Sequence, residues 1–398
     1  MTDRRFDVVI VGAGASGLCA ARELAPDHDV LVLEAGSIGG GASGSAAGFV
    51  SCFEDWARYP DAVERAIDAF EAFDGRYGFE LHERPYVELV ETEAEAARLR
   101  EAYAPLLDRP GYDIAVLDAT ELDRRWPGLF DLEGFVGGLV NDESAIVDGG
   151  AYADSLAACV RDRGGVVETH SPVERVLEAD GSVVGVDAAG ERILADAVVC
   201  AAGAQTPALV AEFVDVPVRQ FVYSNLRVEA DSRLDDGYPM VYGRDLWWRP
   251  EPGRETTLLV SGGMYFLPED GRPPRDAPSE YYDEIAATLP TMAADVDRVR
   301  FVNGSFHTCP KGSSITPDAR PVLDEPAAAP VGLVIAAAVT AGISMSPFTG
   351  AAVRALVTGE PAPISLDPFA LSRFDDPPAD FEVHGIRRMP TEFPSGRY

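Results

Sequence analysis

A glycine-rich turn between two apolar runs is the clearest chemical signal in this sequence. The spacing G-x-G-x-x-G follows directly after the β-branched run 7–11, and its glycines are Gly12, Gly14 and Gly17. A second apolar run, 30–33, ends at Glu34, 22 residues after Gly12. In a β-α-β unit this spacing turns backbone N–H groups towards a pyrophosphate, while the acid accepts ribose hydroxyls. The pattern predicts a dinucleotide site, and the acid disfavours NADP because it would repel the 2′-phosphate.

A second loop of small residues, 39–48, begins five residues after Glu34. Small side chains there would let a cofactor longer than NAD run on past the ribose site, and Ser43 or Ser45 could donate to phosphate. We therefore expect FAD. A flexible surface loop is the alternative interpretation, and an NAD-binding module is disfavoured by this loop.

Residues 347–358 are expected to form a helix with a clean start and end. Ser346 suits the N-cap, Pro347 the first turn and Gly359 the position after the last turn. The N-terminus of such a helix carries about half a positive charge and would stabilise an anionic group beside it. An ordinary, well-capped helix is the other interpretation.

Further motifs occur in order along the chain, at 117–129, 148–168, 197–204, 316–321 and 332–350. With the N-terminal pattern, they resemble the FAD-dependent D-amino-acid oxidase superfamily, in its glycine oxidase, sarcosine oxidase and dimethylglycine dehydrogenase branch. The resemblance covers nearly the whole chain. It includes Thr316-Pro-Asp318 with Pro321, and the passage from Asp148-Gly-Gly150 through a helix expected at 153–163.

The resemblance implies an α/β fold with two domains. A Rossmann-type FAD-binding domain would comprise 1–55, 145–210 and 323–370, and an α+β substrate domain on an antiparallel sheet would comprise 56–144 and 211–322. From the residues themselves we expect a capping box at Thr92 and Glu95, strands at 216–228, 245–248 and 256–260, and a helix at 279–289. The tail 371–398 has little periodicity and is expected to wrap the surface or contact a neighbour.

The glycine pattern and the resemblance together imply a set of FAD contacts. These are Gly12, Gly14, Ser16, Gly17, Glu34, Ala35, Gly41, Ala42, Ser43, Ser45, Gly48, Val173, Ala202, Gly203, Gly342, Ile343 and Ser344.

The resemblance also implies the reaction: oxidation of a small amino acid or N-methylated amine at the carbon next to nitrogen, by hydride transfer to flavin N5, followed by hydrolysis of the imine. Oxygen or another electron acceptor would then reoxidise the flavin. Relatives of the glycine oxidase type place a carboxylate-binding arginine about five residues before the Asp of the Thr-Pro-Asp motif, and here that residue is Ser313. Two alternatives stay open: a flavoprotein subunit of a larger dehydrogenase complex, and an FAD dehydrogenase of a non-amine substrate such as a hydroxy acid.

Four residues are candidates for contact with substrate or oxygen: Lys311, Arg249, Tyr265 and His307. Lys311 is the only lysine of the chain and could bind a substrate anion or assist oxygen reduction; a surface lysine is the plainer interpretation. Cys309 lies near the position where some relatives attach flavin covalently, two residues out of step. Alternation along a strand puts Trp247 and Trp248 on opposite faces, so at most one can face a pocket.

Composition excludes several classes of protein. The 398 residues suggest two or three domains, and 66 Asp and Glu against 33 Lys and Arg give a net charge of −33. Such a charge argues against nucleic-acid binding and against attachment to anionic membranes. Spread along the whole chain, it suggests adaptation to a salty cytoplasm, and an ordinary acidic protein is the plainer interpretation. Five scattered cysteines give no disulfide framework and no zinc motif, and no segment reads as a signal peptide or membrane span. We expect a cytoplasmic enzyme with a small-molecule substrate, as a homo-oligomer or a complex subunit.

Overall fold

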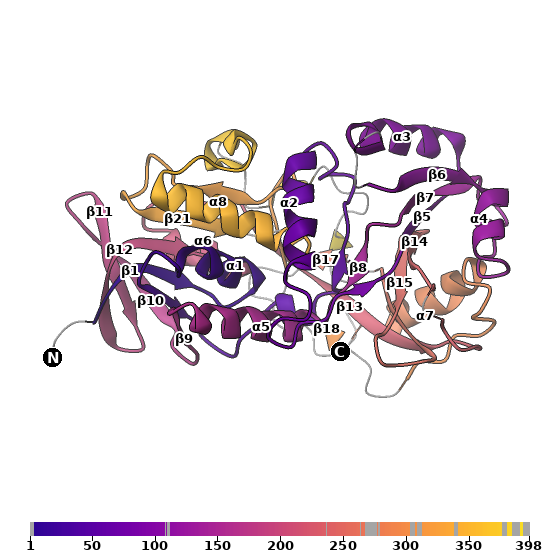
Figure 1. Ribbon diagram of the computed structural model, residues 1–398, viewed down its shortest axis with the longest axis horizontal. Helices are drawn as coiled ribbons and strands as arrows, with labels where there is room; N and C mark the ends of the chain where they lie inside the picture. The colour runs from indigo at the N-terminus through magenta and orange to yellow at the C-terminus, as the bar shows by residue number, and fades with distance from the viewer. Residues whose placement is uncertain are drawn as a thin grey trace.

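The structure of this protein is a computed structural model. The structure describes residues 4–107, 109, 112–235, 237–262, 264–266, 277, 279–302, 307–308, 313–337, 341–375, 380–383 and 391–392. Two large sheets lie side by side, and helix α2 (Pro60–Glu71) lies where the two halves meet (Figure 1).

The first sheet has eight strands in the order β10-β11-β12-β1-β2-β9, with β21 beside β12 and β20 beside β21. Its strands are β1 (Arg4–Val11), β2 (Val30–Leu33), β9 (Val166–Glu168), β10 (Val173–Ala179), β11 (Ser182–Ala188), β12 (Glu191–Cys200), β20 (Val322–Asp324) and β21 (Leu333–Ala337). Strands β9, β2, β1, β12 and β21 run parallel, with β9 at the edge of the sheet. They read as continuous apolar runs because both faces of this sheet are covered.

Three helices cover one face of that sheet: α1 (Ala15–Leu24), α5 (Gly149–Asp162) and α8 (Ser346–Thr358). Val8 and Ile10 of β1 pack into the core shared with these helices. Val9 and Val11 face the other way, into a second core that holds β10, β11 and the short helix α6 (Thr206–Val210). Because successive side chains of β1 point to opposite faces of the sheet, they contribute to two separate cores.

The second sheet has eleven strands in the order β22-β17-β13-β16-β15-β14-β5-β7-β6, with β18 and β19 also on β13. Its strands are β5 (Tyr86–Val90), β6 (Ile114–Asp118), β7 (Gly137–Asn141), β13 (Arg219–Glu229), β14 (Met240–Gly243), β15 (Leu246–Pro250), β16 (Thr257–Ser261), β17 (Met264–Phe266), β18 (His307–Thr308), β19 (Ser313–Ile315) and β22 (Thr391–Glu392). All its pairs are antiparallel except β14 with β5 and β17 with β22.

Smaller elements complete the described part. Helices α3 (Glu93–Leu107) and α7 (Ser279–Thr288) pack on the second sheet, and α4 (Ala119–Arg125) follows β6. The strands β3 (Phe49–Val50), β8 (Ala145–Ile146) and β4 (His82–Glu83) form a small third sheet near the junction. Within the described residues, no helix is both long enough and apolar enough to cross a membrane.

Several local predictions hold and two need correction. The capping box forms, since Glu95 N donates to Thr92 Oγ1 and Thr92 N to the Glu95 carboxylate. Helix α5 begins at Gly149, not at residue 153, because the Asp148 carboxylate accepts from Ala151 N and caps the helix earlier. Ser346 is the first helical residue of α8 rather than its N-cap, which is Met345. The end of α8 is as expected, with Gly359 left-handed at φ 71°.

The C-terminal tail packs on the protein wherever it is described. Strand β22 pairs with β17, and Phe381 and Val383 are buried beside Phe221. The described part of the tail holds one short 3₁₀ turn, Leu371–Arg373, and the two-residue strand β22. The predicted domain boundaries stay a prediction.

Candidate functional site

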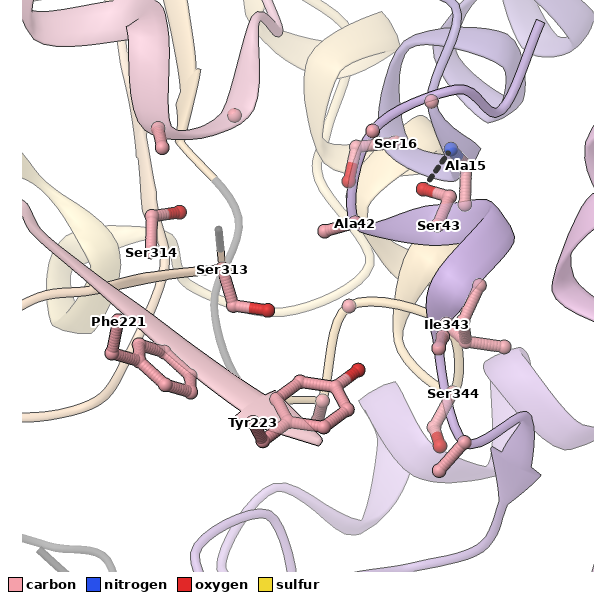
Figure 2. Close-up of a pocket in the computed structure, with 18 of the residues that line it drawn as sticks. Ala15, Ser16, Ala42, Ser43, Phe221, Tyr223, Ser313, Ser314, Ile343 and Ser344 are labelled. Carbon is pink, nitrogen blue, oxygen red and sulfur yellow. Dashed lines mark hydrogen bonds between the residues drawn. The ribbon is translucent and has the colours of Figure 1, made fainter. Parts of the chain in front are cut away.

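A cavity of about 1130 Å³ lies where the two sheets meet. One part of its wall comes from the carboxyl ends of β1, β2 and β12 and from the loop 41–48. The other part comes from the second sheet, where Phe221 and Tyr223 of β13 lie across the cavity from Ile343 and Ser344 (Figure 2). Ligands of open parallel sheets bind at this carboxyl edge.

The glycine turn forms a close-fitting cradle at the first end. Gly12 has φ 107°, and a Cβ there would lie 2.5 Å from the carbonyl oxygen of Ala201. At the start of α1, Ala15 N donates to Ser43 Oγ over 3.0 Å, so the second loop caps this helix (Figure 2). The Glu34 carboxylate accepts from Ala13 N at 3.0 Å and from Gly36 N at 2.7 Å. These contacts hold Glu34 at the cavity wall.

Most of the residues predicted to contact the cofactor line this one cavity. They are Gly12, Gly14, Ser16, Glu34, Ala35, Gly41, Ala42, Ser43, Gly48, Val173, Ala202, Gly203, Gly342, Ile343 and Ser344. Gly17 and Ser45 are not among the lining residues. Gly17 instead packs α1 on β1, because a Cβ there would collide with the carbonyl oxygen of Gly12. The Ser45 carbonyl accepts from Asn225 Nδ2 at 3.0 Å.

Helix α8 starts at the cavity. Gly342, Ile343 and Ser344 line the wall immediately before it, so its N-terminal end is directed there. Ser344 Oγ donates to the Phe49 carbonyl over 2.7 Å. The first residue of α8 also contacts the cavity wall, because Ser346 Oγ donates to the carbonyl of the lining residue Ile343.

A row of side chains crosses the second sheet and faces the cavity. Glu88, Tyr242, Trp247 and Ser261 lie on the neighbouring strands β5, β14, β15 and β16, each paired in register with the next. Trp248 points to the opposite face, where it is fully buried and donates to Tyr238 OH. Only one of the two tryptophans therefore reaches the cavity, in line with the alternation of the strand.

Aromatic rings form the wall beside that row. Phe49, Phe53 and Tyr86 contact one another edge to face, and Phe49 meets Trp247 with ring centroids 5.0 Å apart. These rings give part of the cavity wall an apolar surface, and Glu88 and Ser261 also line the cavity.

Charged side chains also border the cavity. Arg98 of α3 pairs with Glu54, and Asp55 lies beside them with Arg58. Burial raises the pKa of Asp55 to about 6, although the Arg58 charge opposes this shift. Glu88 is 5% exposed and accepts from Tyr86 OH at 3.3 Å.

The four candidates for substrate or oxygen contact differ in where they lie relative to the cavity and in how much of each the structure describes. Arg249 is buried, its Nε donates to the Ala47 carbonyl at 2.6 Å, and burial lowers its pKa to about 10. Tyr265 lies in β17 opposite Val222 and is not among the lining residues. His307 pairs with Asn225 through the backbone of β18, while its side chain, Lys311 and Cys309 lie outside the described residues.

Sequence reasoning missed part of the cavity wall. Phe49, Phe53, Asp55, Tyr86 and Glu88 line it but were not singled out. One signal was available for Glu88, because it is the only charged residue in the apolar run 86–90. A lone acid on a strand that is otherwise apolar is expected to be paired or functional.

Comparisons with known proteins agree with this architecture. The family model described as DAO, FAD dependent oxidoreductase, matches residues 7–356. Glycine oxidase of Geobacillus kaustophilus (strain HTA426) is 26% identical over 394 residues, covering 93% of this chain and 97% of that protein. The crystal structure of glycine oxidase from Geobacillus kaustophilus superposes with a TM-score of 0.79 at 25% identity, covering 94% of this chain and all of that one. That of L-proline dehydrogenase from P. horikoshii gives 0.82 at 16% identity, covering 93% and 98%.

Proposed function

This chain belongs to the DAO family of FAD-dependent oxidoreductases, and on that basis we propose that it oxidises the C–N bond of a small amino acid or N-methylated amine. The observation that carries the proposal is one continuous cavity, which joins the glycine cradle to the aromatic row of the second sheet. The similarity to a glycine oxidase supports an amine substrate.

The residues present fit FAD. Gly12 and Gly14 leave room where a Cβ would meet Ala201 or Ser43, so backbone can approach a pyrophosphate. Glu34, held by two backbone N–H groups, would accept the ribose hydroxyls. The loop 41–48 and residues 342–344 would border the flavin end of the cofactor. Bound there, FAD supplies a hydride acceptor, the N5 atom of its flavin.

The chain's own groups then bind the substrate, orient it and exclude water. Tyr223, Tyr242 and Trp247 would lie over the reacting carbon, and the rings of Phe49 and Tyr86 would close the far side. The N-terminal end of α8 would favour negative charge on its neighbour in the cavity, since a helix N-terminus carries partial positive charge. We also propose Lys311, Tyr265 and His307 as substrate or oxygen contacts.

The test is an anaerobic visible spectrum, in molar KCl, while sarcosine, glycine, proline and D-amino acids are added in turn. Bleaching of the flavin band by one of them would support the proposal, and readmitted air would separate an oxidase from a dehydrogenase. A yellow protein that none of them bleaches would overturn the amine substrate and leave the family assignment in place.

Three finer assignments belong to the same proposal. We assign the eight-stranded sheet to the FAD-binding domain and the eleven-stranded sheet to the substrate domain, with the boundaries given above. The acidic, salt-adapted composition supports a cytoplasmic location. The oligomeric state is tested by light scattering in molar KCl.

A further inference from the structure

Two side chains of the second sheet hold the loop that belongs to the first. Asn225 of β13 donates from Nδ2 to the Ser45 carbonyl at 3.0 Å, and Arg249 of β15 donates from Nε to the Ala47 carbonyl at 2.6 Å. Between and beside them, Ala46, Ala47 and Gly48 line the cavity. Two carbonyls of one short segment thus accept hydrogen bonds from side chains on two different strands.

The two strands use the same arrangement. On β13, Tyr223 lines the cavity and Asn225 lies two residues later; on β15, Trp247 lines it and Arg249 lies two residues later. Residues two apart share a face of a strand. Each strand therefore presents one aromatic ring to the cavity and the next side chain on that face to the loop.

Burial of these two side chains costs free energy. Arg249 is 6% exposed, and in the described part of the chain it forms no ion pair; its guanidinium donates only to the carbonyls of Ala47 and Pro250. Asn225 is 3% exposed, and its Oδ1 has no hydrogen-bond partner among the residues that the structure describes. The charges of Glu251 and Asp148 act on Arg249, but neither carboxylate pairs with it directly. A buried cation without a direct ion pair and a buried acceptor without a described donor both cost free energy. Such costs concentrate where function requires a fixed geometry.

We infer that Asn225 and Arg249 are positioning residues that fix the segment 45–48 in the shape required to bind FAD. This inference rests on the proposed placement of FAD in the cavity. Through these residues the substrate-facing strands would set the position of the cofactor's binding loop. Arg249 would therefore act on the loop rather than on a substrate carboxylate.

The test measures FAD binding and stability separately, with no substrate present. Arg249→Met and Asn225→Leu each replace the donor by an apolar group of similar size. We expect each to raise the Kd for FAD by about tenfold, measured by quenching of flavin fluorescence, because a lost buried hydrogen bond has that scale. The Tm of the FAD-free variants should be unchanged or higher, since the costly burial is relieved.

A matched control lies one step further along the same two strands. Arg227 follows Asn225 by two residues, Glu251 follows Arg249 by two, and the pair is linked by bonds of 2.6 to 2.8 Å. Arg227→Met breaks that ion pair and removes no hydrogen bond to the loop, and it changes only the charges around Arg249, on which both Arg227 and Glu251 act. It should lower the Tm and leave the Kd for FAD unchanged.

Hydrogen–deuterium exchange gives a direct view of the loop. The peptide that covers residues 41–49 should exchange faster in FAD-free Asn225→Leu than in the FAD-free wild type, while that of Arg227→Met should match the wild type. Arg249→Lys, which keeps a charge and a donor, should show a smaller loss of FAD affinity than Arg249→Met.

Two results would overturn the inference: unchanged FAD affinity in both variants, or a loss of affinity matched by a fall in the FAD-free Tm as large as that of Arg227→Met. The proposed function fails on different grounds, namely a wild-type protein that binds no FAD or is reduced by no amine.

Discussion

Asp318 binds Arg373, 55 residues further along the chain, through both oxygens of its carboxylate, with Nε to Oδ2 at 2.9 Å and Nη2 to Oδ1 at 3.1 Å. Arg320 donates to the same carboxylate, and its Nη1 reaches Tyr59 OH. Burial alone would raise the pKa of Asp318, but the hydrogen bonds and charge of Arg373 hold it below its usual value. The Asp of the Thr-Pro-Asp motif is therefore a structural centre, which ties the start of the tail to the body.

Removal of this centre should destabilise the protein without changing its chemistry. Asp318→Asn leaves two partly buried guanidiniums without their carboxylate, and we expect a loss of about 2–4 kcal/mol in the free energy of unfolding. Denaturant titration measures it. The exposed Glu101→Gln serves as control and should change little. An equal effect of both substitutions would contradict the assignment.

Gly17→Ala should disrupt the cradle. Its Cβ would collide with the Gly12 carbonyl oxygen, so α1 must move away from the turn that it follows. We expect a loss of about 3 kcal/mol or more, together with loss of FAD binding. Gly237→Ala is the control, because its nearest atom is an ordinary 3.4 Å away. Calorimetry and flavin fluorescence follow the two effects, and normal FAD affinity in Gly17→Ala would count against the cradle.

Trp247 and Trp248 separate function from packing at neighbouring positions. Trp247→Ala removes a cavity-lining ring, and we expect KM for the amine substrate to rise about tenfold with little change in Tm. Trp248→Phe leaves a hole in a closed core and should cost about 2 kcal/mol of stability, with KM unchanged. Steady-state kinetics and melting curves of both variants decide this. The reverse pattern would mean that the sheet faces are wrongly assigned.

Asp55 should make stability fall as pH rises through the weakly acidic range. Its folded pKa is about 6 against an ordinary 3.8, so the folded state binds the proton more tightly than the unfolded state does. The ionised form therefore costs stability above about pH 6, and this cost disappears as pH falls towards about 4. Asp55→Asn should be more stable than wild type by about 1–3 kcal/mol at neutral pH and equal to it near pH 4. A stability difference between Asp55→Asn and wild type that does not vary with pH would contradict the raised pKa of Asp55.

Salt should stabilise the folded protein. A net charge of −33 repels itself in dilute buffer, and molar salt shortens the screening length to about 3 Å. We expect Tm to rise steadily from low to molar KCl. Sucrose, an uncharged solute that also favours compact states, is the control and should give a smaller rise at equal osmolality. A Tm that does not respond to KCl would exclude adaptation to salt.

Features that depend on residues close together in the chain could be predicted from the sequence. The turn at Gly12, the strands β1 and β2, the capping box at Thr92 and the left-handed Gly359 each depend on residues close together in the chain. Such features follow from backbone sterics and period, which act over a few residues. The start of α5 was misjudged because a neighbouring side chain, the Asp148 carboxylate, decides it. The start of α8 was one residue off, with Met345 as its N-cap and no side-chain cap.

By itself, therefore, the sequence determined the dinucleotide cradle, the kind of fold and the acidic composition of the protein. Tertiary structure alone decided which side chains meet in the cavity. Glu88, Tyr242 and Trp247 come from three strands whose register depends on packing across the sheet. It also decided that Arg249 donates to the Ala47 carbonyl, a contact that no local pattern predicted. Long-range contacts of this kind depend on how two sheets close against each other, and no local pattern encodes that geometry.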